Sequence, residues 1–251
     1  MNTNYTEIAE LIINARYPIA FTGAGISVES GIPPFRGQGG LWTKYDPDTL
    51  DLSRFRNNPG LTWGPIKEIF YDHWGEASPN AAHYALARME EMSLLKGIVT
   101  MNIDALHQKA GSRNVVEFHG TLDSMVCMRC HSTHSSRGIN LSTLPPRCKC
   151  GGVLKPNFIF FGENIPANAY TQSMEMAEKA DLVIVAGTTG EVMPACCIPT
   201  TAARKGARIV EINPTESSFT HSITTHYLPE KAGKALGGIM AEVEKLYQLQ
   251  K

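Results

Sequence analysis

Four of the six cysteines are spaced as metal ligands. Two residues separate Cys127 from Cys130, one residue separates Cys148 from Cys150, and 17 residues lie between the two pairs. This spacing is close to that of a four-cysteine zinc ribbon, although the second pair is one residue shorter than usual. Four thiolates would complete a tetrahedron and leave no open position, so the predicted zinc is structural. Two redox-active or buried thiol pairs are the alternative.

The stretch that holds these cysteines, residues 124–154, is rich in Cys, Ser, Pro and Lys. It has too few large apolar side chains to fold without a staple such as a metal. His131 and His134 lie in this stretch and are alternative zinc ligands. Cys196 and Cys197 fall at the predicted start of a helix, where we expect small buried hydrophobic side chains, although a helix N-terminus would lower a thiol pKa.

A glycine-rich segment, residues 20–37, resembles a phosphate cradle. Its glycines at Gly23 and Gly25 permit a tight turn and a close backbone approach to a pyrophosphate. A dehydrogenase fingerprint would need a third glycine where Val28 stands, and an acidic residue at the end of the next strand. We therefore expect the segment to run on into a flexible aromatic cover instead of a phosphate-binding helix. A strand-to-helix turn without a ligand is the alternative.

Three polar side chains at the ends of two predicted strands are candidates for proton transfer and ribose binding. Asn102 and Asp104 end one strand, and His119 ends the next. A carboxylate, an amide and an imidazole in one crevice can bind ribose hydroxyls and move a proton. A structural histidine at a strand end is the alternative for His119.

These residues need a scaffold that brings strand ends together, and the hydrophobic pattern provides one. Strands alternating with helices predict an α/β fold with a parallel sheet covered by helices on both faces. Ligands of such sheets bind beyond the carboxyl ends of the strands. Strands are expected at 18–22, 96–102, 114–120, 157–163, 181–187 and 207–213, and helices at 6–16, 78–92, 167–180, 194–205 and 233–250.

Length and charge narrow the functional classes. The chain has 251 residues, 43% of them apolar, a size compatible with one large domain or with one domain plus a small insert. With 23 basic and 24 acidic side chains it lacks the basic excess of a nucleic-acid or membrane-surface binder. No apolar run approaches the roughly 20 residues that cross a bilayer, and the N-terminus does not read as a signal peptide. We therefore expect a cytoplasmic protein with neither nucleic acid nor membrane as partner.

Taken together and in order, the motifs resemble those of the sirtuins, the NAD-dependent protein lysine deacylases. The resemblance runs from about residue 7 to 245 and rests on "GAGISVESGIPPFRG", "TMNIDALHQKAG", "FHG", the paired cysteines, "NFIFFGE", "GTTGEVMPA" and "VEIN". It implies a Rossmann-like NAD-binding domain and a small domain made of a helical insert and a zinc ribbon. The implied division is 1–34, 77–123 and 155–251 for the large domain, 35–76 for the cofactor loop and helical insert, and 124–154 for the ribbon.

The resemblance also implies roles for particular residues. His119 would be the general base, and Cys127, Cys130, Cys148 and Cys150 would bind zinc. The cofactor-binding residues would be Gly23, Ala24, Gly25, Phe35, Arg36, Asn102, Ile103, Asp104, Gly187, Thr188, Thr189 and Asn213. The peptide would add as a strand between residues 161–164 and 190–193, contacting Phe161, Gly162, Glu163 and Val192.

In the implied reaction NAD is consumed: the acyl oxygen displaces nicotinamide, and free lysine and O-acyl-ADP-ribose are formed. Acylated-lysine proteins are the expected substrates, and a monomer is expected. Ile66 and Ile69 stand where acid-accepting members resemble one another in a Tyr-x-x-Arg pair, so a neutral acyl group, acetyl first, is predicted. Pro34 and Met101 depart from the family pattern at NAD contacts and predict weaker cofactor binding. Desuccinylation or demalonylation, mono-ADP-ribosyl transfer and a binding module are the alternatives.

Overall fold

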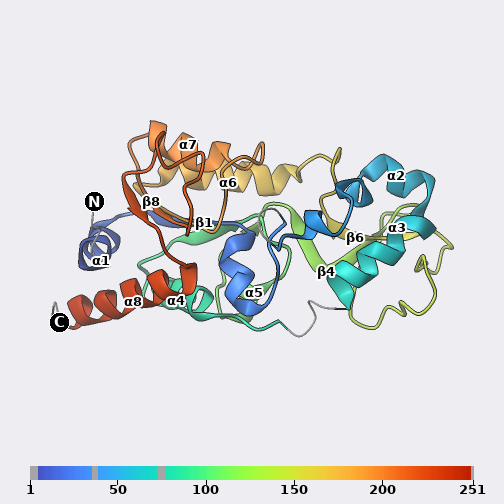
Figure 1. Ribbon diagram of the computed structural model, residues 1–251, viewed down its shortest axis with the longest axis horizontal. Helices are drawn as coiled ribbons and strands as arrows, with labels where there is room; N and C mark the ends of the chain where they lie inside the picture. The colour runs from blue at the N-terminus through green and yellow to red at the C-terminus, as the bar shows by residue number, and fades with distance from the viewer. Residues whose placement is uncertain (1–4, 36–38, 73–76, 250–251) are drawn as a thin grey trace.

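The computed structural model describes residues 5–35, 39–72 and 77–249 of the chain. A large part built on a parallel sheet occupies most of its length, and a smaller part carrying α2, α3, β4 and β6 lies beside one end of it (Figure 1). The alternation of strands and helices therefore produced the expected α/β architecture.

The large part contains a six-stranded sheet in the order β3-β2-β1-β7-β8-β9, and every neighbouring pair is parallel. All residues of the central strands β1 and β7 are buried, because a parallel sheet is covered on both faces. Strand β9 is a correction, since it was not among the expected strands. A segment of three residues is too short to show the apolar–polar alternation that is typical of a strand. The strands are Pro18–Thr22 (β1), Gly97–Thr100 (β2), Val115–Glu117 (β3), Leu182–Ala186 (β7), Arg208–Ile212 (β8) and His226–Leu228 (β9).

Helices cover both faces of this sheet, as predicted (Figure 1). On one face α1 and α4 both pack against α8, and on the other α6 packs against α7. Each face has its own buried apolar cluster, so the sheet is the middle of three layers. The helices are Tyr5–Asn14 (α1), Ala81–Glu91 (α4), Leu106–Lys109 (α5), Ala167–Lys179 (α6), Cys197–Arg204 (α7) and Ala232–Leu249 (α8).

The smaller part combines the aromatic insert, described over residues 39–72, and the cysteine-rich stretch in one core. Trp63 of the insert is fully buried and donates its indole N–H to the Leu154 carbonyl at 2.9 Å. Phe70 of the insert packs on Phe158 with 5.0 Å between ring centroids. The insert holds 3-10 helices Leu41–Thr43 and Pro47–Leu50, helices Leu52–Asn57 (α2) and Pro59–Ile66 (α3), and the π-helical turn Lys67–Tyr71. The antiparallel sheet β5-β4-β6 is built from Gly120–Cys127 (β4), Thr133–Ser135 (β5) and Leu154–Phe158 (β6).

Strand β6 differs from the strand predicted at 157–163. It starts three residues earlier and pairs antiparallel with β4, outside the parallel sheet. The apolar run continues to Phe161, but there the backbone leaves β4: the Ile159 N–H bonds to the His119 carbonyl and the Phe161 N–H to that of Leu50. Strand β4 begins before residue 124 and β6 extends beyond residue 154, so both strands cross the predicted limits of the ribbon. The division of the rest of the chain into domains stays a prediction.

The glycine-rich segment begins with tight helical turns. Directly after β1 it forms a 3-10 helix, Ala24–Ser30, which Gly31 ends in the left-handed conformation with φ of 86°. The chain then continues through Pro33 and Pro34 to Phe35, in the direction of the predicted aromatic cover.

Candidate functional site

A cleft of about 1210 Å³ opens beyond the carboxyl ends of β1, β2, β7 and β8, and residues of the smaller part form its other wall. Ligand pockets usually measure roughly 300–1,000 Å³, so this cleft has room for a dinucleotide and a further side chain. Fifteen of the predicted cofactor, catalytic and substrate residues line it: Gly23, Ala24, Gly25, Phe35, Asn102, Ile103, His119, Phe161, Gly162, Glu163, Gly187, Thr188, Thr189, Val192 and Asn213.

Two predicted cofactor residues remain to be accounted for. Asp104 does not line the cleft, and Arg36 lies outside the described residues. The individual roles assigned to the lining residues remain predictions, since lining a cleft does not establish a contact.

Positions 23 and 25 require glycine because any side chain there would collide with the backbone of Gly187, a contact that the sequence does not reveal. Gly23 has φ of −127°, an extended conformation open to any residue. A Cβ on Gly25 would come within 2.7 Å of the Gly187 Cα, and one on Gly23 within 2.8 Å of the Gly187 carbonyl oxygen. The Gly25 N–H donates to that oxygen at 2.8 Å. The loops after β1 and β7 thus pack backbone to backbone at the base of the cleft.

Ser27 links the two polar residues that follow β2. Its hydroxyl donates to the Asp104 carboxylate at 2.7 Å and accepts from the Asn102 side-chain amide at 3.1 Å. The Leu106 N–H also donates to Asp104, at 2.9 Å. Burial raises the pKa of Asp104, and these hydrogen bonds oppose that rise. Asp104 therefore supports the position of Asn102 through Ser27.

His119 is oriented as a base. Its Nδ1 lies 3.2 Å from the Met101 carbonyl oxygen. A carbonyl oxygen only accepts hydrogen bonds, so Nδ1 carries the proton and Nε2 keeps its lone pair. Burial lowers the pKa of His119 below its usual value, which keeps the ring neutral at pH 7. The imidazole on the cleft wall can thus accept a proton.

Lys155 supports the predicted substrate segment from below. Its side chain is 2% exposed, and its Nζ donates to Glu163 at 2.9 Å and to the Phe158 carbonyl at 2.7 Å. The ammonium also lies 4.2 Å from the Phe160 ring centroid. Glu163 in turn accepts the Phe160 N–H at 2.8 Å. No local sequence pattern marks this lysine as buried, so its role was not predicted.

The backbone of Phe161 is already paired. Its N–H donates to the Leu50 carbonyl at 2.8 Å, and its carbonyl accepts the Leu52 N–H at 3.0 Å. Its side chain remains 49% exposed on the cleft wall. These two backbone groups are therefore not open to a bound peptide, and the predicted peptide strand would pair with backbone groups that follow Phe161.

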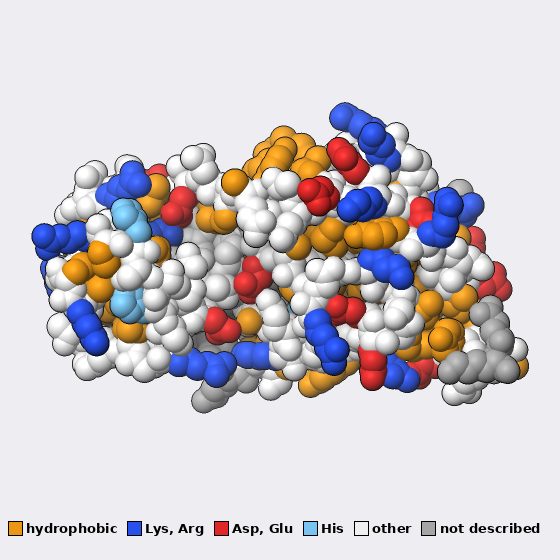
Figure 2. All heavy atoms as spheres, turned by 180° about the vertical axis from the view of Figure 1, so that it is seen from behind, with side chains coloured by type: hydrophobic (Ala, Val, Ile, Leu, Met, Phe, Trp, Pro, Cys, Tyr) orange, Lys and Arg blue, Asp and Glu red, His pale blue; other side chains and the backbone are white. Residues whose placement is uncertain are grey.

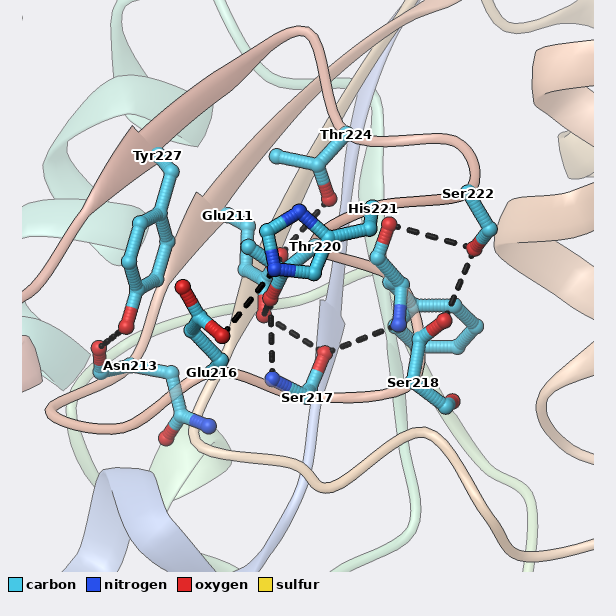
Figure 3. A network of polar contacts seen from close by, with 11 residues as sticks. Glu211, Asn213, Glu216, Ser217, Ser218, Thr220, His221, Ser222, Thr224 and Tyr227 are labelled. Atoms are coloured by element: carbon cyan, nitrogen blue, oxygen red, sulfur yellow. Dashed lines mark hydrogen bonds and ion pairs between the residues drawn. The ribbon is translucent and has the colours of Figure 1, made fainter. Parts of the chain in front are cut away.

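A buried carboxylate organises the loop that follows β8, beside the cleft. Glu211 of β8 is 1% exposed and accepts hydrogen bonds from the hydroxyls of Ser217, Thr220 and Thr224, which fold the following loop over it (Figure 3). At the start of that loop, the side-chain amide of Asn213 donates to the Thr188 carbonyl at 3.2 Å. In the sequence, Glu211 stands out only as an acidic residue inside an apolar strand, and this was the one pattern that could have pointed to it.

The four predicted zinc ligands converge. Their Sγ atoms all lie within 4.8 Å of one another, with 3.5 Å between Cys127 and Cys150 and 3.8 Å between Cys130 and Cys148. Zinc–sulfur bonds of about 2.3 Å place tetrahedral sulfurs about 3.8 Å apart, so the set fits a structural zinc. His134 stays outside the set, with Nε2 3.4 Å from the Cys148 Sγ. The short Cys148–Cys150 spacing is thus compatible with the tetrahedron.

Fold and site define an α/β protein with a dinucleotide-sized cleft between a parallel sheet and a zinc-ribbon module. A model of the Sir2 family matches residues 23–194. The chain is 41% identical to NAD-dependent protein deacylase 2 of Pyrobaculum aerophilum, over 95% of both chains, and 41% identical to an NAD-dependent protein deacetylase of Saccharolobus solfataricus, over 96% of this chain and 98% of that one.

Solved structures agree with this assignment. A Sir2 homologue mutant in complex with ADP-ribose superimposes with a TM-score of 0.92 at 37% identity, covering 97% of this chain and 98% of that one. A complex of a Sir2 homologue with NAD gives 0.89 at 37% identity, covering 96% and 94%. The chain belongs to the Sir2 family.

Proposed function

We propose that the protein is an NAD-dependent protein lysine deacylase. The observation that carries the proposal is His119, a neutral imidazole whose Nδ1 is fixed by a carbonyl, on the wall of a cleft that also gathers the predicted NAD-binding residues. The relatives named as NAD-dependent deacylases and deacetylases support the same chemistry.

The cleft residues fit NAD as a co-substrate. The apposed glycine loops bring backbone to the base of the cleft, and Thr188 and Asn213 offer polar groups along it. NAD supplies a ribose that is open to substitution when nicotinamide departs. The chain's own contribution is to hold Asn102 through Ser27, to accept a proton at His119 Nε2, and to exclude water with the aromatic cover around Phe35.

We further propose that the acyl group is neutral, with acetyl as the first candidate. The sequence argument needs correction, because Ile66 and Ile69 lie in the core of the smaller part and do not line the cleft. Among the described lining residues, the charged ones are Glu29, Glu163, Glu191 and Lys231. Glu163 is already paired with Lys155, and Lys231 is the one cation among the described lining residues, so an acidic acyl group would find few partners for its charge, and an unpaired buried charge is costly.

The central test is nicotinamide release from NAD with and without an acetyl-lysine peptide. We expect release to depend on the peptide and to yield O-acetyl-ADP-ribose by mass spectrometry. Peptide-independent release would overturn the proposal, and an ADP-ribosylated protein adduct would indicate transferase activity instead. His119→Ala should lower deacylation about 10²- to 10⁴-fold, the usual contribution of a general base.

A matched comparison of acetyl- and succinyl-peptides tests the acyl preference. We expect a higher kcat/KM for the acetyl-peptide, because Lys231 is the one cation that the described cleft wall offers to a carboxylate. Faster succinyl turnover would contradict this preference without affecting the deacylase assignment.

Two features of the molecule bear on its expected partners and location. No helix of the described residues is long and apolar enough to cross a membrane. Figure 2 shows basic and acidic side chains interspersed on one face of the molecule. We propose acylated-lysine proteins as substrates; a cytoplasmic location, a monomeric state and the absence of nucleic acid as a partner stay predictions.

A further inference from the structure

Three sulfur atoms meet at the rim of the cleft, away from the zinc ribbon. The Met193 Sδ lies 2.9 Å from the Cys196 Sγ and 3.9 Å from the Cys197 Sγ. The turn into α7 creates this arrangement: the Cys196 N–H bonds to the Val192 carbonyl and the Cys197 N–H to that of Pro194. The side chains at positions i, i+3 and i+4 are therefore brought to one side of the chain.

We propose that Met193, Cys196 and Cys197 form a binding site for Cu(I). Thiolate and thioether sulfurs are the soft ligands that select Cu(I), whereas the zinc ribbon offers thiolates alone. Three sulfurs around one ion at bonds near 2.3 Å would stand about 4 Å apart, so a small opening of the Met193–Cys196 contact admits the ion. Each thiol that becomes a ligand releases its proton to solvent.

The site is accessible, contrary to the expectation of buried thiols. Cys196 and Cys197 are each partly exposed, and Met193 is 66% exposed and lines the cleft. An ion can therefore reach the three sulfur atoms from solvent.

The test is a titration of zinc-loaded protein with Cu(I) supplied as its bicinchoninate complex under anaerobic conditions, with released zinc followed by a chromogenic chelator. We expect the wild-type protein to take up one Cu(I) per chain while retaining its zinc. Cys196→Ser with Cys197→Ser should abolish this uptake. Met193→Leu should weaken it at least about tenfold, the loss seen when even an outer partner of a metal ligand is removed.

Two results would overturn the proposal: uptake by the double serine variant equal to that of the wild type, or release of one zinc for every Cu(I) bound. Circular dichroism and zinc content of each variant verify that the fold and the ribbon are intact. If the double variant does not fold, Cys196→Ser alone replaces it and is expected to weaken Cu(I) binding; unchanged affinity in that variant would also refute the site. None of these readouts depends on deacylase activity.

Discussion

At the scale of single residues, the buried histidines differ in what they do. His119 lies on the cleft wall with one ring nitrogen fixed, whereas His83 and His107 lie side by side in the interior, 4.9 Å between ring centroids. His107 Nε2 lies 2.9 Å from the Thr22 hydroxyl, and His83 Nδ1 accepts the Asn80 N–H. His83 Nε2 and His107 Nδ1 have no protein partner among the described residues. Burial without a compensating charge makes protonation of either ring unfavourable.

This pair predicts an acid-sensitive fold. Burial lowers the pKa of His83 to about 4 and of His107 to about 3, against about 6.5 in the unfolded chain. The unfolded state binds protons first, so stability is intact above pH 6.5 and falls as the pH drops toward 4. At 1.36 kcal/mol per unit, each histidine would remove roughly 2 kcal/mol from the free energy of unfolding between pH 6.5 and 5.

Urea unfolding at pH 7 and pH 5 measures this effect. The variant His83→Gln with His107→Gln should show a much smaller loss of stability between the two pH values than the wild type. His221→Gln, which changes an exposed histidine, is the matched control and should behave as the wild type. An equal loss in the wild type and the double variant would show that other groups govern the acid response.

At the scale of elements, Lys155 connects the ribbon strand β6 to the predicted substrate segment. Its backbone pairs with Val126, next to the zinc ligand Cys127, while its ammonium holds Glu163 at the cleft. The position of the substrate segment therefore depends on a buried ion pair as well as on local sequence.

Lys155→Met tests this connection. We expect a raised KM for the acyl-peptide with a smaller change in kcat, because the segment loses its anchor while His119 is untouched. Removing one partner of a buried pair also predicts a stability loss of about 3 kcal/mol. Lys149→Met, at an exposed lysine of the same ribbon, is the control. An unchanged peptide KM in Lys155→Met would exclude a positioning role.

At the scale of the whole molecule, zinc supports more than the ribbon. The aromatic insert and the ribbon share one core, which contains Trp63, Phe55 and Met125, whereas the parallel sheet has separate cores on its two faces. Loss of the metal should therefore disturb the smaller part and one wall of the cleft while leaving the sheet folded.

Removal of zinc by a chelator should abolish peptide deacylation and change the tryptophan fluorescence, because Trp63 is bonded to the ribbon at Leu154. Far-UV circular dichroism should change little, since the larger helices belong to the other part. Restoring zinc should reverse both effects. Unchanged fluorescence and activity in zinc-free protein would contradict a structural role for the metal.

Sequence patterns predicted the parallel sheet, the zinc cysteines and fifteen of the residues that line the cleft. Hydrophobic periodicity marks buried strands locally, and parallel strands all end at one edge, so Asn102, His119 and Asn213 had to converge. Only the tertiary structure decided which strand joins which sheet, as β6 and β9 demonstrate. Lys155, Ser27 and Glu211 likewise acquire their roles from partners elsewhere in the chain. Burial and pairing at a distance depend on the packed fold, and local sequence patterns do not encode them.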